Sequence, residues 1–245
     1  MKTEELCYEA DGLSMIGHLA WDETATTPRP AVLVFPEAFG LGAHAKARAE
    51  RIVSEFGYVA LACDLHGDQK VFPDLGTMMP VLTALRGDIA RVRARTRKAL
   101  EALLRRREVD ASRVAAIGFC YGGTLAYELA LAGADIKAAV GFHSGLQVSA
   151  PQDAGQIKAK VLALIGADDP GVPPEDRAAF EAVLRAGKVD WQMTLYGGVV
   201  HSFTNPDADL LGKPDFLRYD AVADRRSWQQ MRALFAEVLG ESPTS

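Results

Sequence analysis

The feature that most constrains how this chain folds is a cysteine placed between two glycines, Gly118-x-Cys120-x-Gly122. The apolar run 113–117 before it predicts a buried strand, and residues 124–130 after it predict the first turns of a helix. Where a strand turns directly into a helix the backbone doubles back, and a Cβ at either flanking glycine would collide with it. The pattern therefore predicts a sharp strand–turn–helix junction with Cys120 at the bend.

A thiol at this bend has two chemical advantages. The helix N-terminus favours the thiolate, and the free backbone N–H groups of the first turn can bind an oxyanion. The alternative is that Cys120 is simply a small buried residue in a tight turn, because free cysteine is among the most buried residue types. The strand–turn–helix context favours a catalytic Cys120. Cys7 and Cys63 lack that context, and we expect both to be structural.

Short apolar runs alternate with amphipathic stretches over the rest of the chain. A hairpin is predicted around the turn dipeptide Asp11-Gly12, and buried strands are predicted at 31–35, 58–63, 113–117, 137–142, 160–165 and 191–196. Helices are predicted at 44–56, 81–107, 124–130, 174–186 and 220–239. This alternation predicts one α/β domain over residues 1–245, with a doubly wound, mostly parallel sheet and an N-terminal antiparallel hairpin.

The stretch before the helix at 81–107 contains Pro73, Gly76 and Pro80 and shows no clear period, so residues 70–80 predict a loop over the site. The helix itself has one face rich in arginine, which raises the question of a nucleic-acid surface. Acidic residues interrupt that face and no aromatic residues interleave with the arginines. A solvated helix face is the better interpretation.

Charge and cysteine usage limit the partners and the compartment. The net charge of −5 gives no reason to expect nucleic acid or an anionic membrane, and no apolar run approaches the ~20 residues that span a bilayer. Three separated cysteines argue for a reducing compartment, and no clustered His/Cys spacing suggests a metal site. The acidic N-terminus does not resemble a secretory signal. We therefore expect a cytoplasmic protein with a small-molecule substrate, either a monomer or a weak homo-oligomer.

A cysteine nucleophile needs a base to accept its proton, and the base needs a third group that sets its tautomer. Among the histidines, His201 has the most suitable position, in the loop after the last predicted strand. His66 and His143 also follow strands, and either could line the pocket. A lone loop histidine is more often structural than catalytic, so the choice of His201 depends on the order of residues along the chain.

Two aspartates in the loop after the strand at 160–165 qualify as the third group. We favour Asp169, which lies where the loop turns back over the sheet, and expect Asp168 to brace the turn. The order Cys120, Asp169, His201 is then the hydrolase order of nucleophile, acid and histidine.

Glu37 lies in the loop after the strand at 31–35, at the edge where open α/β sheets bind their ligands. From position alone it is either a functional carboxylate or a solvated loop charge. The residues themselves leave both interpretations open.

Four motifs together resemble the dienelactone hydrolase family, the carboxymethylenebutenolidases, over nearly the whole chain. They are Pro36-Glu37-Ala38-Phe39-Gly40, Gly118-Phe119-Cys120-Tyr121-Gly122-Gly123, Gly166-x-x-Asp169-x-x-Val172-Pro173 and His201-Ser202-Phe203. The cysteine junction is similar to the nucleophile elbow of α/β-hydrolases, which normally carries serine. The resemblance implies a cofactor-free carboxylic-ester hydrolase with the α/β-hydrolase fold and a Cys120, Asp169 and His201 triad.

The same resemblance implies roles for neighbouring groups. Glu37 would take up the thiol proton as substrate binds, and the backbone N–H groups of Ala38 and Tyr121 would form the oxyanion hole. The candidates for lining the substrate pocket are Phe39, Arg86, Ser202 and Phe203.

One position departs from the family. Asn205 stands where dienelactone hydrolases have an arginine that binds the substrate carboxylate, and Arg86 is the candidate for supplying a charge instead. The hypothesis that this protein cleaves another small ester or lactone, through an acyl-thioester on Cys120, is therefore at least as well supported as the hypothesis that it cleaves dienelactone itself. The alternatives are a broad small-ester or thioester hydrolase, and a protein that binds a ligand or senses oxidants through Cys120 without turnover.

Overall fold

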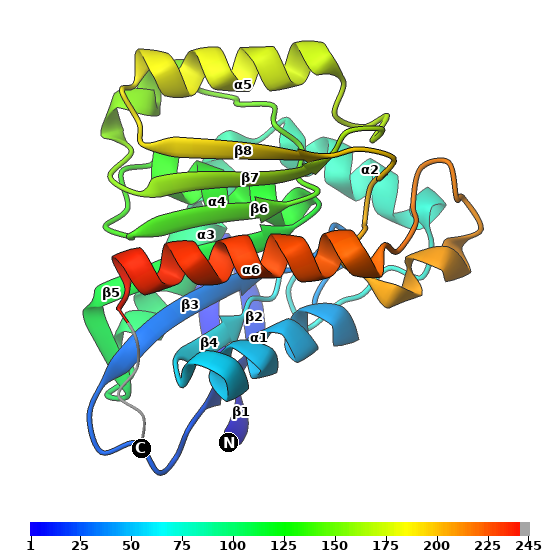
Figure 1. Ribbon diagram of the computed structural model, residues 1–245. Helices are drawn as coiled ribbons and strands as arrows, with labels where there is room; N and C mark the ends of the chain where they lie inside the picture. Colours follow the sequence, from blue (N-terminus) through cyan, green and yellow to red (C-terminus); the bar gives the residue numbers. More distant parts are fainter. Residues whose placement is uncertain (241–245) are drawn as a thin grey trace.

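An eight-stranded sheet forms the centre of the computed structural model, which describes residues 1–240 (Figure 1). In chain order the strands are β1 (Lys2–Ala10), β2 (Leu13–Trp21), β3 (Arg29–Phe35), β4 (Val59–Ala62), β5 (Val109–Phe119), β6 (Ala138–Phe142), β7 (Lys160–Gly166) and β8 (Trp191–Tyr196). They lie side by side in the order β1-β2-β4-β3-β5-β6-β7-β8. β2 pairs antiparallel with β1 and β4, and the other neighbours are parallel.

Helices cover both faces of this sheet (Figure 1). They are α1 (Ala43–Phe56), α2 (Leu75–Arg86), α3 (Ile89–Leu104), α4 (Tyr121–Leu131), α5 (Pro174–Ala186) and α6 (Ala221–Val238), with 3-10 helices η1 (Pro151–Gln156) and η2 (Pro206–Leu211). On one face, α1 and α6 bury side chains such as Ile52 and Trp228. On the other, α2 to α5 bury side chains such as Leu103 and Phe180. The predicted fold class, doubly wound with an N-terminal antiparallel hairpin, is confirmed.

The central strands are apolar without alternation because both of their faces are covered. Every residue of β6 is buried, and so is every residue of β3 and β7 except the first. β1 is instead an edge strand whose exposed and partly buried residues alternate over most of its length. The helices among residues 1–240 all fall short of the combined length and hydrophobicity that a membrane-spanning segment requires.

The prediction of one helix at 81–107 preceded by a loop at 70–80 is wrong. The chain forms two helices, α2 and α3, separated at Gly87 and Asp88. Each begins at an aspartate whose carboxylate accepts a first-turn N–H: Asp74 from Thr77 at 2.8 Å, and Asp88 from the third residue of its helix at 3.0 Å. Pro80 lies inside α2 although it lacks a helix-bonding N–H, because the capped start and a buried inner face stabilise that helix.

The carboxyl ends of the parallel strands meet at one edge of the sheet, on the right in Figure 1, next to α2 and the segment containing η2. Among the loops at this edge, those after β3, β5, β7 and β8 carry Glu37, Cys120, Asp169 and His201 respectively. The topology therefore brings together side chains that are up to 164 residues apart, His201 being 201 − 37 positions after Glu37.

Candidate active site

Cys120 occupies the turn between β5 and α4 with φ +54° and ψ −122°, a conformation that non-glycine residues rarely adopt. A Cβ at Gly118 would overlap the backbone of Gly122, and one at Gly122 would overlap the carbonyl groups at the end of β3. Glycine at both positions is what allows this turn to close. The backbone N–H of Cys120 is held by two acceptors, the carbonyl oxygen of Phe142 at 3.0 Å and Nδ1 of His143 at 3.1 Å.

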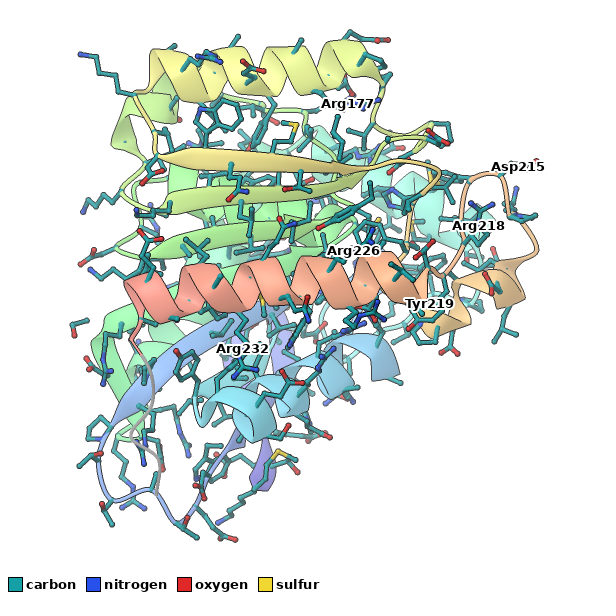
Figure 2. The ribbon with its side chains drawn as sticks, in the orientation of Figure 1. Arg177, Asp215, Arg218, Tyr219, Arg226 and Arg232 are labelled. Carbon is teal, nitrogen blue, oxygen red and sulfur yellow. The ribbon has the colours of Figure 1, made fainter. Side chains whose placement is uncertain are left out.

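His201 and Asp169 form a buried hydrogen bond, with 2.6 Å between Nδ1 of the ring and Oδ2 of the carboxylate. The other carboxylate oxygen, Oδ1, accepts the N–H of Gly171 at 2.8 Å, so the aspartate is fixed on both sides. The backbone of His201 pairs with the segment between η2 and α6, donating its N–H to Phe216 and accepting the N–H of Arg218. Figure 2 shows that segment, labelled at Arg218, projecting beyond the sheet edge.

The electrostatic environment of His201 favours its charged form. Burial alone would lower the pKa of the ring, but the charge of Cys120, together with the hydrogen bonds to Asp169 and Cys120, outweighs this and raises the pKa of His201 well above its usual range. An imidazolium paired with a thiolate is what a cysteine nucleophile requires at neutral pH. His201 thus interacts with Asp169 through its Nδ1 and also with the side chain of Cys120.

Glu37 is almost buried and its carboxylate is held by two residues of the His201 loop. Oε1 accepts the hydroxyl of Ser202 at 2.8 Å, and Oε2 accepts the side-chain amide of Asn205 at 2.5 Å. The residue that replaces the family arginine thus binds a carboxylate of the protein itself. Ser202, which was expected to line the substrate pocket, lies here as a hydrogen-bond donor to Glu37.

Two backbone positions near the thiol were expected to form an oxyanion hole. Tyr121 begins α4, so its N–H is one of the first-turn donors that have no partner within the helix. Ala38 is buried directly after Glu37, and its carbonyl oxygen lies 2.8 Å from Nε2 of His66. His66 therefore contacts the loop that would carry the second donor.

Two cavities flank this cluster. One of about 100 Å³ is lined by Arg86, Tyr121 and Thr124, and the guanidinium of Arg86 lies 6.0 Å from the centre of the Tyr121 ring. The other, of about 370 Å³, lies on the far side of Glu37 and is lined by Phe39 together with Asn205 and apolar side chains. Both cavities carry polar groups among apolar walls, as small-molecule sites do.

Phe203 does not line either cavity, which corrects the expectation for this residue. Its ring is fully buried against His143, at 5.1 Å between ring centres, and against Tyr196 at 5.5 Å. The chain leaves β8 so that His201 faces the thiol while Phe203, two residues on, enters the core beneath α6.

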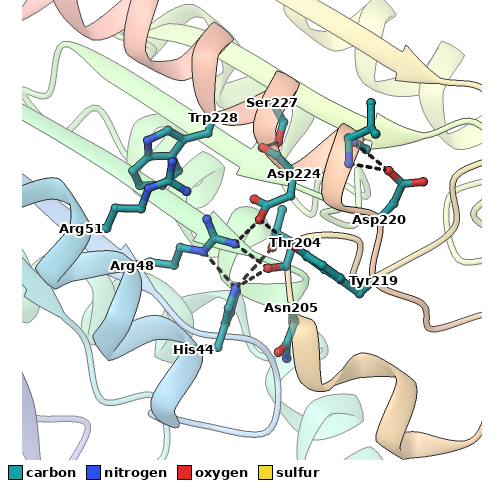
Figure 3. Close-up of polar contacts among 12 residues, drawn as sticks. His44, Arg48, Arg51, Thr204, Asn205, Tyr219, Asp220, Asp224, Ser227 and Trp228 are labelled. Carbon is teal, nitrogen blue, oxygen red and sulfur yellow. Dashed lines mark hydrogen bonds and ion pairs between the residues drawn. The ribbon is translucent and has the colours of Figure 1, made fainter. Parts of the chain in front are cut away.

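Sequence reasoning missed a buried polar network that runs from His143 to α1 and α6, and Figure 3 shows the part of it around Arg48, Thr204 and Asp224. His143, expected only as a possible pocket residue, is fully buried between Cys120 and Thr204. The carbonyl oxygen of Thr204 in turn accepts from Arg48, which pairs with Asp224 at 2.9 Å. The one sequence signal for this network is a histidine placed directly after an apolar strand.

Within residues 1–240, no three histidine, cysteine or acidic side chains are grouped so that they could hold a metal ion. Asp168, the alternative to Asp169, is exposed, and its backbone N–H donates to Val199.

Comparison with known proteins agrees with this fold. The family model described as "Dienelactone hydrolase family" matches residues 16–239. A solved dienelactone hydrolase-like promiscuous phosphotriesterase from metagenomic libraries is 46% identical, with a TM-score of 0.92, over 98% of this chain and 99% of that one. A "Putative carboxymethylenebutenolidase" from Salmonella typhimurium is 28% identical over 243 residues, which are 95% of this chain and 86% of that protein.

The contact between Asp169 and His201 leads to a pH-dependent prediction. The pKa of His201 is raised in the folded protein, so protonation of this ring stabilises the folded state. The stabilisation is fully present at pH values below the pKa of a free histidine, about 6.5, and it is lost as the pH rises through the pKa of the folded protein. Asp169→Asn should move the NMR titration midpoint of His201 to lower pH and destabilise the protein by about 1–3 kcal/mol at pH 6. The destabilisation should shrink as the pH rises.

Asp168→Asn is the matched control, since that carboxylate is exposed one residue away. Equal titration midpoints for His201 in both variants would contradict a charge-stabilising contact with Asp169.

Proposed function

The chain belongs to the dienelactone hydrolase family, and from that premise we propose that it is a carboxylic-ester hydrolase that cleaves a small ester or lactone. The nucleophile in this proposal is the Cys120 thiolate, with His201 as acid and base and Asp169 as the group that orients it. The observation that carries the proposal is the buried 2.6 Å contact between His201 and Asp169, in a site where the charge of Cys120 raises the pKa of the histidine.

In the first half-reaction, the thiolate of Cys120 attacks the ester carbonyl carbon, and a C–S bond forms while the carbonyl π electrons move onto oxygen. The N–H groups of Ala38 and Tyr121 would hold that oxyanion, and removing one such donor typically costs ~10²–10³ in rate. As the tetrahedral intermediate collapses, the His201 imidazolium gives its proton to the leaving oxygen. The products of this step are an alcohol, or the tethered alcohol of a lactone, and an acyl-thioester.

In the second half-reaction, neutral His201 takes a proton from water, and the hydroxide attacks the thioester carbonyl. The C–S bond then breaks, the acid leaves, and the thiolate–imidazolium pair is restored. Asp169 holds the ring orientation through both steps. In a lactone the leaving oxygen stays tethered and can re-attack, which favours substrates whose released enolate rearranges to a ketone.

When the resting cysteine is a thiol rather than the thiolate of the ion pair, Glu37 is the candidate for receiving its proton: the proton moves from sulfur to the carboxylate as substrate binds, and it returns to sulfur after the acid has left. The two hydrogen bonds of Glu37 to Ser202 and Asn205 hold the carboxylate in the resting site. Each carboxylate oxygen keeps a lone pair beyond these contacts, so the group can accept the thiol proton without losing either donor.

Arg86 is the candidate for recognising a negatively charged acyl group. It lies at the C-terminus of α2, at the wall of the smaller cavity and over the ring of Tyr121, whose N–H is a proposed oxyanion donor. A carboxylate in that cavity would meet the guanidinium while the ester carbonyl remains near the thiol.

The same site favours a second candidate reaction, the hydrolysis of phosphotriesters. The supporting observation is the 46% identity over nearly the whole chain to the promiscuous phosphotriesterase. Attack of the thiolate on phosphorus would form a P–S bond and expel the aryloxide, which takes the proton of the His201 imidazolium. Neutral His201 would then take a proton from water, and the hydroxide would displace the Cys120 thiolate from phosphorus.

The nucleophile assignment predicts that Cys120→Ala lowers kcat for p-nitrophenyl acetate by at least about 10³-fold. One equivalent of iodoacetamide should abolish turnover in a Cys7→Ala background, which is needed because Cys7 is also exposed. Cys7→Ala without the reagent is the control and should keep its activity. Full activity of Cys120→Ala would exclude the assignment, and a single equivalent of nitrophenol without further release would identify a reactive thiol rather than an enzyme.

The role of Arg86 predicts a selective effect on anionic substrates. Arg86→Gln should raise KM for a p-nitrophenyl ester with a free carboxylate by about three- to tenfold, because a partly exposed charge pair contributes modestly. KM for p-nitrophenyl propionate should stay within twofold. Arg97→Gln, on an exposed part of α3, is the control. An equal rise in KM for both esters would argue against carboxylate recognition.

For the phosphotriester reaction, the wild-type protein should release p-nitrophenolate from diethyl p-nitrophenyl phosphate steadily over many turnovers, and Cys120→Ala should release none above background. Release that stops after one equivalent would show that the thiophosphate ester is not hydrolysed, and this second candidate would then fail.

A further inference from the structure

His143 lies where the nucleophile loop meets the loop that carries His201. It directly follows β6, its side chain is fully buried, and its φ of +40° is unusual for a residue other than glycine. A strained backbone conformation persists only where the surroundings hold it, and such positions cluster at functional sites. The ring of His143 stands edge-on to that of His201, with 5.3 Å between their centres.

Each ring nitrogen of His143 has a partner in a different loop. Nδ1 accepts the backbone N–H of Cys120 at 3.1 Å, and Nε2 lies 2.8 Å from Oγ1 of Thr204. A backbone N–H can only donate, so Nδ1 carries a lone pair and the ring proton is on Nε2, where it is donated to Thr204. The contacts therefore define both the tautomer and a neutral ring.

The surroundings of His143 keep it neutral. Burial lowers the pKa of this ring well below its usual range, and the neighbouring charges of His201, His44 and Arg48 lower it further. A neutral ring beside His201 does not compete with the imidazolium that the thiolate requires.

Thr204 is itself fixed from the opposite side (Figure 3). Its carbonyl oxygen accepts Nη2 of Arg48 at 2.5 Å and lies 3.1 Å from Nε2 of His44, both on α1. Arg48 pairs in turn with Asp224 near the start of α6. The chain of contacts from Cys120 through His143 to Thr204 thus ends on two helices packed against the sheet.

We propose that His143 is a positioning residue for the hydrolytic reaction, which fixes the backbone of Cys120 relative to the loop that carries His201. This inference rests on the proposed function and adds a residue to its machinery. The N–H of Cys120 has one backbone acceptor, Phe142, besides this ring. Without the ring, the strained turn would lose one of its two acceptors and Thr204 would lose its link to the nucleophile. A displacement of about 1 Å between reacting groups can cost 10²-fold in rate.

Three substitutions separate the two contacts. In His143→Asn the amide oxygen can take the place of Nδ1 and accept from Cys120. In His143→Gln the amide nitrogen reaches the place of Nε2 and Thr204 but leaves no acceptor for the cysteine N–H. His143→Leu removes both contacts, and His18→Gln, at a partly buried histidine of β2 paired with Glu50, is the control for loss of an imidazole.

We expect kcat for p-nitrophenyl acetate to fall about tenfold or more in the Gln and Leu variants but less than about threefold in the Asn variant, with KM within twofold in all three. Alkylation of Cys120 by iodoacetamide at neutral pH, in the Cys7→Ala background, should slow in the same order. A residue that only fills volume would favour Gln over Asn, because Gln is closer in size to the buried histidine and Asn leaves a larger cavity. Equal kcat and equal alkylation rates in the Asn and Gln variants, or higher values in the Gln variant, would therefore overturn the proposal.

Two checks distinguish failure of the positioning proposal from misfolding of a variant and from failure of the proposed function. Near-ultraviolet circular dichroism identifies a variant that does not fold. If the Leu variant does not fold, the comparison of the Asn and Gln variants is sufficient to test the proposal. If the wild-type protein does not turn over the ester, the proposed function fails, whereas the alkylation series still tests the positioning role because it needs no turnover.

Discussion

The close approach of backbone to backbone at the end of β5 is the constraint on which the rest of the site depends. Glycines at 118 and 122 let the start of α4 lie against the ends of β3 and β5, where any side chain would overlap main-chain atoms. The turn then holds Cys120 at a positive φ, at the end of β5. Its backbone is stabilised by Phe142 and His143, which belong to the neighbouring strand and its loop.

Titratable side chains lie on one side of that turn, and a buried, hydrogen-bonded ion pair lies on the other. On one side, the charge of Cys120 and the buried hydrogen bond to Asp169 raise the pKa of the His201 imidazole, and Glu37 lies within the same group of loops. On the other, Arg48 lies between α1 and α6, with its guanidinium 5.8 Å from the ring of Phe119 and 5.4 Å from that of Trp228. A buried cation is costly unless it is paired and hydrogen-bonded. Here Asp224 and the carbonyl oxygen of Thr204 meet that requirement.

The replacement of the family arginine by Asn205 changes the charge of the resting site. In this chain the amide binds Glu37, together with Ser202, so the carboxylate is held by neutral donors rather than by a cation. Among the proposed substrate-facing groups, Arg86 is the positively charged one, and it belongs to α2 on the other side of the thiol. In the proposed reaction, recognition of a charged acyl group therefore falls to Arg86 on α2 rather than to the loop that carries His201.

The sequence alone determined the class of fold and the family, because buried parallel strands are continuous apolar runs and because the Gly-x-Cys-x-Gly turn tolerates few alternatives. It also identified Asp169 and His201 as the partners of Cys120, an assignment that stays a prediction. Only the tertiary structure decided that α2 and α3 are separate, that Phe203 enters the core, and that His143 links two loops. Burial and hydrogen-bond partners of these residues depend on contacts with segments far away in the chain, and a local pattern carries no information about them.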